Sequence, residues 1–368
     1  MNTPLADHLD SQIRSQGPLS FHLFMEQALF HQEHGFYASG QTRTGRKGDF
    51  LTPVSPGPVL GELLARQADE LHVALGRPER IRLIEQGADA GWLARDLLAA
   101  IHREHPELAQ ASELHLIEPH PRLAEKQKET LGEAAKRTRW HPSWETIPGD
   151  GIPSFFYSCE LVDSFPARIF RFRGGTWREQ RVDRGPSGLV WQEAEIDAAT
   201  WAGIRQWNPP EMEGFTMELR PGTPALVKGW TEKISTGLAF TLDYGFPASE
   251  LLSPGRSAGT LVALRGHQRV ADPLADPGQL DLTTHVNFTE LEELAAREGW
   301  RHYGLTNFSR GLTALAANLL KDVAQLPEAW IRNFRHLTHP NFFGHTHKIL
   351  VQGKSLPESF HPAVLEKI

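Results

Sequence analysis

Acidic side chains follow directly after four short apolar runs of the chain, at Glu85, Glu118, Glu160 and Asp243. Carboxylates accept hydrogen bonds from hydroxyl groups and pair with cationic groups. Glu118, which follows the run 114–117, is placed to hold the hydroxyls of a ribose. Acids that end successive strands therefore indicate a nucleotide-type ligand, bound at one edge of a sheet.

After Glu85 the chain enters a glycine-containing turn, and Trp92 begins an apolar pattern typical of a helix. Glycines let the backbone approach a ligand, and the N–H groups at a helix N-terminus favour a negative group. A dinucleotide fingerprint G-x-G-x-x-G starting at Gly87 would need glycine where Asp89 and Trp92 stand. The methyltransferase-type frame E-x-G-x-G-x-G fits better, because only Asp89 departs from it. The other positions of this frame are occupied by Glu85, Gly87 and Gly91. Taken without the rest of the chain, the loop could also be a turn that binds no ligand.

These residues are positioned by predicted strands that alternate with helices. The strands are expected at 81–85, 114–117, 139–140, 155–159 and 238–242, with an edge strand at 347–351. Helices are expected at 20–34, 59–75, near 227–235 and in the tail from 291, and a hairpin at 168–190 with its turn at 174–175. This order predicts an α/β fold with a mostly parallel, doubly wound sheet and helices on both of its faces.

Length and composition narrow the class of protein. A chain of 368 residues suits one large α/β domain with additions, or two domains, and leaves the oligomeric state open. The net charge of −7 argues against nucleic acid as the main partner. The single cysteine, Cys159, excludes an internal disulfide framework and favours a reducing compartment. Without a signal-peptide pattern or a run of ~20 apolar residues, the chain is predicted to be cytoplasmic, soluble and not inserted in a membrane.

Histidine is common in the chain, but its spacing does not predict a metal site. The closest candidates are the pairs His102 and His105, and His345 and His347. Neither pair has the H-E-x-x-H order or a neighbouring set of cysteines, so surface or packing roles are expected. His285 is expected to tie a loop by hydrogen bonding, with a substrate-side role as the alternative.

A series of short blocks occurs in one order from about residue 18 to residue 352. The two most specific are 160–166 (ELVDSFP) and 281–288 (DLTTHVNF), and others are 24–25, 35–37, 48–50, 177–179, 243–245 and 259–261. In this order the chain resembles the MidA-like family of SAM-dependent methyltransferases, which are related to the mitochondrial complex I assembly factor that methylates a protein arginine. The resemblance implies a class I, Rossmann-like methyltransferase fold with an N-terminal extension and helical insertions. It also implies S-adenosyl-L-methionine as cofactor and a protein arginine as substrate.

The expected organisation is an N-terminal segment over 1–75 and a methyltransferase-like domain over 76–352, followed by a tail at 353–368. The insertions are expected at about 168–235 and 265–345.

The resemblance also assigns cofactor-binding residues. Those expected to help close over S-adenosyl-L-methionine are Gly48, Asp49 and Phe50. The methionine end of the site is assigned to Glu85, Gly87 and Gly91, and the ribose to Glu118.

Glu160 and Asp163 are the candidate catalytic acids on the substrate side. Methyl transfer from a sulfonium is an in-line displacement, so an enzyme contributes mainly positioning and electrostatics. A guanidinium pairs bidentately with carboxylates, so the two acids would orient it and draw positive charge away from the attacking nitrogen. The alternative is that both acids only cap the turn after the strand.

Three positions depart from the family pattern. Asp89 replaces the middle glycine of the loop; aspartate tolerates a left-handed backbone, but its charge lies where the carboxylate of the cofactor approaches. Ser55 stands where a glutamate is expected, and Cys159 where an asparagine is expected. The alternative class is therefore a degenerate methyltransferase fold that serves as a non-catalytic assembly or binding protein. A nicotinamide dehydrogenase is disfavoured by Trp92.

Overall fold

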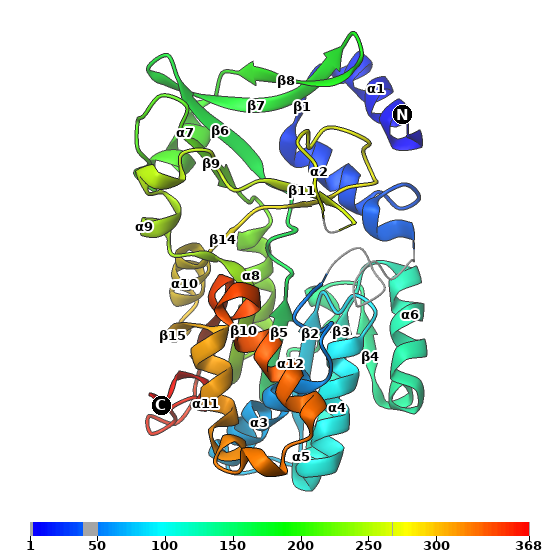
Figure 1. Ribbon diagram of the computed structural model, residues 1–368, viewed down its shortest axis with the longest axis vertical. Coiled ribbons are helices and arrows are strands. Elements are labelled where there is room, and N and C mark those ends of the chain that lie inside the picture. Colours follow the sequence, from blue (N-terminus) through cyan, green and yellow to red (C-terminus); the bar gives the residue numbers. More distant parts are fainter. Residues whose placement is uncertain (1–2, 40–50, 267, 368) are drawn as a thin grey trace. The chain divides into compact units, whose positions relative to one another are not determined.

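Figure 1 shows the computed structural model of the protein, which describes residues 3–39, 51–266 and 268–367. The chain divides into two compact units. Unit 1 comprises Met1–Gln41, Val162–Ala225 and Gly245–Glu290, and unit 2 comprises Thr42–Leu161, Leu226–Tyr244 and Leu291–Ile368. The segment expected at 1–75 contributes to both units. The tail expected at 353–368 belongs to unit 2, where Phe360 and Val364 join the hydrophobic core.

Unit 2 is built on a sheet with the strand order β15-β16-β10-β5-β2-β3-β4. These strands are β2 (Ile81–Gln86), β3 (Ser112–Ile117), β4 (Arg139–His141), β5 (Ser154–Cys159), β10 (Gly237–Phe246), β15 (Arg301–Asn307) and β16 (His347–Lys354). The pairs from β10 through β5, β2 and β3 to β4 are parallel, and β16 runs antiparallel to both β10 and β15. The mostly parallel, doubly wound sheet of the predicted fold class is thus confirmed. Its topological switch point lies between β2 and β5.

Helices cover both faces of this sheet. On one face α3 (Val59–Ala74), α4 (Trp92–Glu104), α11 (Phe308–Leu320) and α12 (Glu328–Thr338) share a core cluster with the strands. Successive side chains of a strand point to opposite faces, so Phe155 and Tyr157 of β5 join this cluster while Phe156 does not. Phe156 instead packs on the other face against Trp144 and against Trp230 of α8 (Thr223–Lys233), with ring centroids 5.1 and 5.9 Å away.

The remaining helices of unit 2 connect the strands. They are α5 (Pro106–Ala111), α6 (Pro121–Leu131) and the larger part of α10 (Phe288–Arg297). No helix within the described part of the chain is both long enough and apolar enough to cross a membrane.

Two sequence predictions for the end of the chain are wrong. The strand predicted at 347–351 is not an edge strand, because β16 lies between β10 and β15. The edge strand is β15, within the tail that was predicted to be helical. All residues of β15 are partly or fully exposed, so they lack the apolar alternation that identifies a strand. Hydrogen bonds to β16 hold β15 in the sheet, and Tyr303 adds a partly buried contact with the core.

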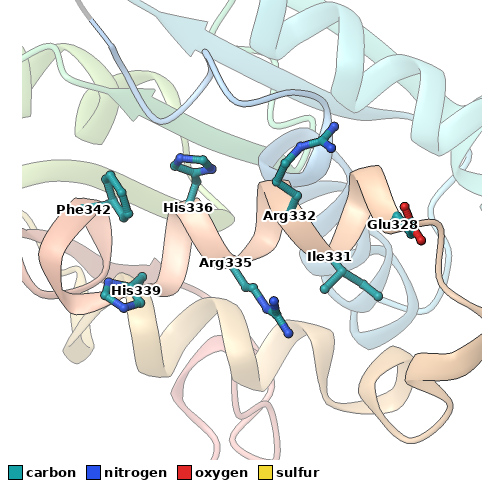
Figure 2. A pocket seen from close by; sticks show the side chains of 7 residues that line it. All are labelled: Glu328, Ile331, Arg332, Arg335, His336, His339 and Phe342. Atoms are coloured by element: carbon teal, nitrogen blue, oxygen red, sulfur yellow. The ribbon is translucent and has the colours of Figure 1, made fainter.

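Helix α12 has two contrasting faces. Trp330, Phe334 and Leu337 are buried in the core at helical spacing. The opposite face carries Arg332 and Arg335, both exposed, together with exposed histidines (Figure 2).

Unit 1 has its own sheets and core. An antiparallel sheet has the order β1-β7-β6-β9, with β8 paired to β7, and a smaller sheet has the order β12-β11-β13. Its strands are β1 (Leu19–Ser20), β6 (Arg168–Arg173), β7 (Thr176–Gly185), β8 (Gly188–Ala194), β9 (Thr216–Leu219), β11 (Val262–Arg265), β12 (Gln268–Arg269), β13 (Asp281–Thr283) and β14 (Val286–Asn287). Its helices are α1 (Pro4–Gln16), α2 (Phe21–Phe30), α7 (Ala198–Arg205) and α9 (Ala248–Leu251). The predicted hairpin is the pair β6–β7, and both glycines of its turn have positive φ.

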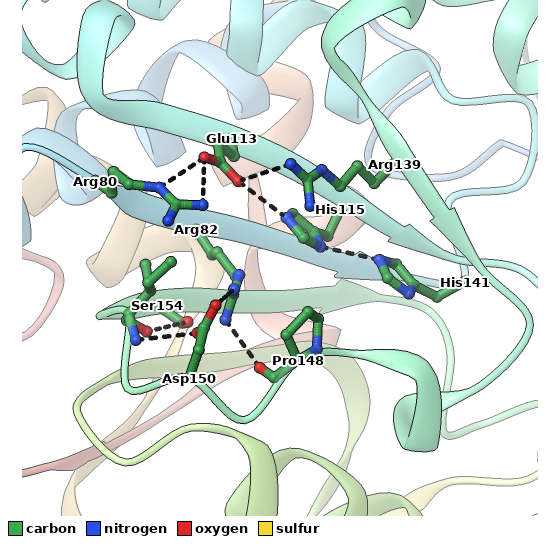
Figure 3. A network of polar contacts seen from close by, with 10 residues as sticks. Arg80, Arg82, Glu113, His115, Arg139, His141, Pro148, Asp150 and Ser154 are labelled. Atoms are coloured by element: carbon green, nitrogen blue, oxygen red, sulfur yellow. Dashed lines mark hydrogen bonds and ion pairs between the residues drawn. The ribbon is translucent and has the colours of Figure 1, made fainter.

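A polar network joins strands β2, β3 and β4 within unit 2 (Figure 3). His115 is fully buried, with its Nδ1 3.0 Å from His141 Nε2 and its Nε2 3.7 Å from Glu113 Oε2. Arg82 is also buried, and its guanidinium donates to the carbonyl of Pro148 and to the Asp150 carboxylate. Burial, followed by the positive charge of Arg82, lowers the pKa of His115 to about 4.

The depressed pKa of His115 predicts that this histidine makes the folded protein less stable in mild acid. The unfolded chain binds a proton near the ordinary pKa of 6.5, whereas the folded protein resists protonation until about pH 4. Buried acids with raised pKa values, such as Glu85 and Glu118, become more stabilising as the pH falls, so the effect of His115 is measured against a variant that lacks it. The His115 contribution to the free energy of unfolding is expected to fall by about 1–2 kcal/mol between pH 7 and pH 5. Urea denaturation at both values measures this loss, which the His115→Gln variant should reduce. The exposed His361, changed to Gln, is the control; a pH dependence that is the same in both variants would contradict the assignment.

Candidate functional site

The loop after β2 has the backbone geometry of a ligand-binding turn. Gly87, Asp89 and Gly91 all have positive φ, at 78°, 44° and 84°. Asp89 therefore adopts the left-handed conformation that the sequence predicted it would tolerate. A Cβ added at Gly87 would lie 2.8 Å from Leu161 Cδ1 and 3.3 Å from Leu161 Cβ, so Leu161 would have to shift to admit a side chain. The loop after β2 thus packs tightly on the turn after β5, at the switch point where doubly wound sheets bind ligands.

Helix α4 begins at this loop without a capping side chain. Gly91 is its N-cap residue and provides no side-chain hydrogen bond to the first turn. The N–H groups of an uncapped first turn carry partial positive charge and attract anions. A carboxylate on a bound ligand fits this position.

Glu118 follows β3 and is held by two hydrogen bonds. Its Oε1 accepts from the His120 N–H at 2.8 Å, and its Oε2 accepts from Gln127 Nε2 at 2.9 Å. Gln127 Nε2 also donates to the carbonyl of Asp89, and Gln127 Oε1 accepts from Trp140 Nε1, each at 3.0 Å. The fully buried Gln127 on α6 therefore joins the glycine loop to Glu118. The role of Gln127 could not be predicted from the sequence, because nothing in a polar helix distinguishes a glutamine that contacts a binding site from one that faces solvent.

The electrostatic setting of Glu118 is unusual. Burial raises its pKa to about 7, and the nearby charge of Asp89 acts in the same direction. The hydrogen bonds from His120 and Gln127 oppose this shift only in part. Glu118 is thus a carboxyl group that titrates near neutral pH.

Glu85 lies deeper, at the carboxyl end of β2. It is 2% exposed, and burial raises its pKa to about 8, while the interaction with Tyr157 lowers it in part. Within the described residues its Oε2 has no hydrogen-bond partner. A buried acceptor without a partner is costly in a folded protein, and a cationic group of a ligand would satisfy it.

Glu160 is brought to the same edge of the sheet by the turn after β5. Its φ is 50°, and its N–H donates to the carbonyl of Leu242 at 2.9 Å. Its Oε1 lies 2.8 Å from Nε2 of His347, the first residue of β16. His347 is buried, and its ring lies 5.2 Å from that of Phe308 and 5.1 Å from that of Phe343. The sequence had given His347 only a surface or packing role, because 187 residues separate it from Glu160.

Asp243 holds this turn. It lies within β10, which continues to Phe246, so the strand end predicted at 242 is wrong. Asp243 is fully buried, and its Oδ2 accepts from the N–H of Leu161 at 3.2 Å while its Oδ1 accepts from the N–H of Tyr244 at 2.8 Å. Asp243 therefore fixes Leu161, which in turn packs against Gly87. The ring of Tyr244 lies 5.4 Å from that of His347.

Asp163 belongs to unit 1, whereas Glu160 belongs to unit 2. Asp163 is buried, and its carbonyl accepts from the N–H of Thr284 at 3.0 Å.

In the same unit, the N–H of His285 donates to Thr260 Oγ1 at 2.9 Å, as expected for a residue that ties a loop. Burial, followed by the charge of Arg220, lowers the pKa of His285 to about 4.

Other predicted residues are placed as follows. Gly48, Asp49 and Phe50 lie outside the described residues. Ser55, which replaces the expected glutamate, accepts a hydrogen bond from the N–H of Thr52 at 2.9 Å and so closes a local turn. No group of three or more His, Cys, Asp or Glu residues within the described ranges is arranged to hold a metal ion.

The fold and these residues can now be compared with known proteins. The family model for S-adenosyl-L-methionine-dependent methyltransferases matches residues 63–306. The chain belongs to this family. The resemblance to MidA-like methyltransferases is thereby confirmed, together with the expected cofactor of the family.

Individual relatives agree with this assignment. The chain is 27% identical over 319 residues to the mitochondrial protein arginine methyltransferase NDUFAF7 of Mus musculus, which covers 80% of this chain and 70% of the relative. The Homo sapiens protein of the same name is 26% identical over 314 residues, covering 80% and 69%. A crystal structure of a COG1565 superfamily member from Burkholderia thailandensis, bound to S-adenosyl-homocysteine, has a TM-score of 0.87 at 25% identity, covering 100% of this chain and 97% of that one.

The residues at this edge of unit 2 fit S-adenosyl-L-methionine. The uncapped start of α4 suits its carboxylate, the unpartnered Oε2 of Glu85 suits its ammonium, and Glu118 suits its ribose hydroxyls. When bound, the cofactor supplies a methyl group on a sulfonium. Glu160 and Leu161 follow the neighbouring strand β5, next to the glycine loop.

We expect Gly87→Ala to damage the site through contact with Leu161. The methyl group would enter the space of Leu161, so the variant should lose about 1–3 kcal/mol of stability and bind S-adenosylhomocysteine at least about tenfold more weakly. Urea denaturation and calorimetric titration measure the two effects. Gly132→Ala is the matched control, because Gly132 also has a positive φ but nothing lies within 4 Å of its added Cβ. Equal losses in both variants would mean that backbone strain, not the contact, is responsible.

The pKa of Glu118 predicts how cofactor binding depends on pH. Glu118 is mostly protonated at pH 6 and mostly ionised at pH 8, and an ionised carboxylate accepts stronger hydrogen bonds from ribose hydroxyls. The affinity for S-adenosylhomocysteine should therefore rise by about threefold or more over this interval. Calorimetric titration at both pH values of the wild-type protein, Glu118→Gln and the exposed control Glu129→Gln tests this. If Glu118→Gln retains the full pH dependence, Glu118 does not hold the ribose.

Proposed function

We propose that the protein transfers a methyl group from S-adenosyl-L-methionine to the guanidinium of an arginine side chain in another protein. The observation that carries this proposal is the pair formed by Glu160 and His347 at the carboxyl edge of the sheet. The relatives named as protein arginine methyltransferases support the choice of acceptor.

The chemistry of arginine methylation requires a fixed carboxylate. A guanidinium remains cationic at ordinary pH, so its attacking nitrogen is a poor nucleophile unless charge is drawn toward another nitrogen. A carboxylate that pairs with the guanidinium both orients it and draws positive charge away from the attacking atom. His347 engages one oxygen of Glu160, and the hydrogen bond from the Glu160 N–H to Leu242 fixes the backbone. Glu160 is thereby held in one orientation before the substrate arrives.

Asp163 remains the second candidate acid of this proposal. It directly follows the turn that carries Glu160, and it is buried although carboxylates seldom are. The cytoplasmic location also remains a prediction from the sequence. The relatives, by contrast, are named as mitochondrial proteins.

The proposal predicts a selective loss of activity in Glu160→Gln. The amide can still accept from His347 but carries no charge to pair with a guanidinium, so methyl transfer should fall by about 100-fold or more. Transfer is measured with isotope-labelled S-adenosyl-L-methionine and proteins from cells that lack the gene, with methylarginine detected by mass spectrometry. Affinity for S-adenosylhomocysteine should stay within about threefold, because Glu160 is assigned to the substrate side.

The exposed Glu298, changed to Gln, is the control for this experiment. Loss of cofactor affinity as large as the loss of transfer would move Glu160 to the cofactor side. A well-folded wild-type protein that does not bind S-adenosylhomocysteine would overturn the enzymatic proposal and leave the non-catalytic binding protein.

A further inference from the structure

The exposed face of α12 forms a basic hollow that the proposed chemistry does not use. A depression of about 370 Å³ is lined by residues of α12 and of the turn that follows it. Its charged and aromatic members are Arg332, Arg335, His336, His339 and Phe342, with Glu328 at one end (Figure 2). In Figure 2 the side chains of Arg332 and His336 project to one side of the helix and that of Arg335 to the other. The hollow is therefore flanked by positive charge on both sides.

The arginines of this hollow differ from those on other helices of unit 2. Arg66 pairs with Glu104 at 2.7 Å, and Arg103 pairs with Glu62 at 3.0 Å. Throughout the described residues, by contrast, no ion pair or hydrogen bond involves the side chain of Arg332 or Arg335. Positive charge gathered in this way is uncommon on a protein with a net charge of −7, and it is complementary to an acidic ligand.

The hollow also offers apolar surface. Phe342 is 51% exposed, one of the most exposed large hydrophobic residues of the described chain, and Ile331 lies in the same lining. Exposed aromatic side chains beside arginines are typical of protein interaction sites. A phosphate or another small anion would leave this apolar surface unused, whereas a peptide with acidic and apolar side chains would contact both.

The hollow lies next to the candidate catalytic residues. Phe342 precedes Phe343, whose ring lies 5.1 Å from that of His347. His347 in turn bonds Glu160. A chain segment lying along α12 therefore has one end within a few side chains of the carboxylate assigned to the target arginine.

We propose that the α12 hollow binds an acidic segment of the protein substrate, next to the arginine that is methylated. This inference rests on the proposed function, because it makes the hollow a second contact for the same substrate. Arg332 and Arg335 supply the charge complementarity, and Phe342 at one end of the hollow and Ile331 toward the other each offer apolar surface to the segment (Figure 2). Binding energy gained here, away from the reacting atoms, positions the arginine at Glu160.

The test is direct binding, measured by fluorescence anisotropy without cofactor. The probe is a short fluorescein-labelled peptide with one arginine, several Asp and Glu residues and one Leu; its twin has Asn and Gln in place of the acids. The acidic peptide should bind more tightly than its twin, and its affinity should fall as salt is added. The double variant Arg332→Glu with Arg335→Glu should weaken its binding by about tenfold or more.

A matched control separates this effect from net charge. Arg137→Glu with Lys367→Glu changes the charge equally at exposed positions outside the hollow, and it should leave the affinity within about twofold. Equal binding of the two peptides, or no effect of the double variant, would overturn the inference and leave a solvated helix face. Binding of a single-stranded oligonucleotide but not of the acidic peptide would also overturn it.

Failure of the docking inference can be distinguished from failure of the proposed methyl transfer. Peptide binding without any methyl transfer would keep the docking site and reject the enzymatic proposal. Methyl transfer that is equally fast for the acidic peptide and its twin, in wild type and double variant, would reject the docking site and keep the enzyme.

Discussion

The contact of Leu161 with Gly87 is the constraint on which the candidate site depends. It joins the loops that follow β2 and β5 at the switch point of the sheet, and Leu161 would have to shift to admit a Cβ at Gly87. The N–H of Leu161 is held by Asp243 from the third strand of this group, β10. Because these loops are locked together, Glu160 takes a left-handed backbone and its carboxylate meets His347. The packing at Gly87 and the hydrogen bond to Asp243 thus position the turn that carries Glu160, the acid proposed to face the substrate.

The buried acids at the same edge of the sheet also have raised pKa values. Glu85 and Glu118 are buried acids whose pKa values are raised to about 8 and about 7, so both titrate near neutral pH. A cofactor that carries a sulfonium and an ammonium compensates buried acids, and the uncapped start of α4 compensates its carboxylate. Asp89 adds negative charge to this balance, but its carbonyl, like Glu118, is tied to Gln127. The bond from Gln127 fixes the backbone of this position, and the Asp89 carboxylate adds negative charge that raises the pKa of Glu118 further.

Four central strands could be predicted from the sequence, whereas one edge strand and two site residues could not. The strands β2, β3, β5 and β10 are recognisable because they are buried on both faces and are mostly apolar, although Arg82 and His115 interrupt β2 and β3. Edge strand β15 was not predicted, since all of its residues are partly or fully exposed and it lacks the apolar alternation that identifies a strand. Gln127 and His347 were missed as site residues for a related reason. Their roles arise from partners on other elements, and nothing in their local sequence marks them.

The sequence by itself determined the fold class, the family and the position of the glycine loop, because these depend on local apolar runs, on turn residues and on the order of short motifs. It also indicated which acids end the strands. Only the tertiary structure decided which partner each acid has: Glu118 with Gln127, Glu160 with His347, and Asp243 with the turn after β5. The reason is physical. A side chain's pKa and orientation are set by burial and by neighbours that the fold brings from distant parts of the chain, and these neighbours exist only after the sheet has formed.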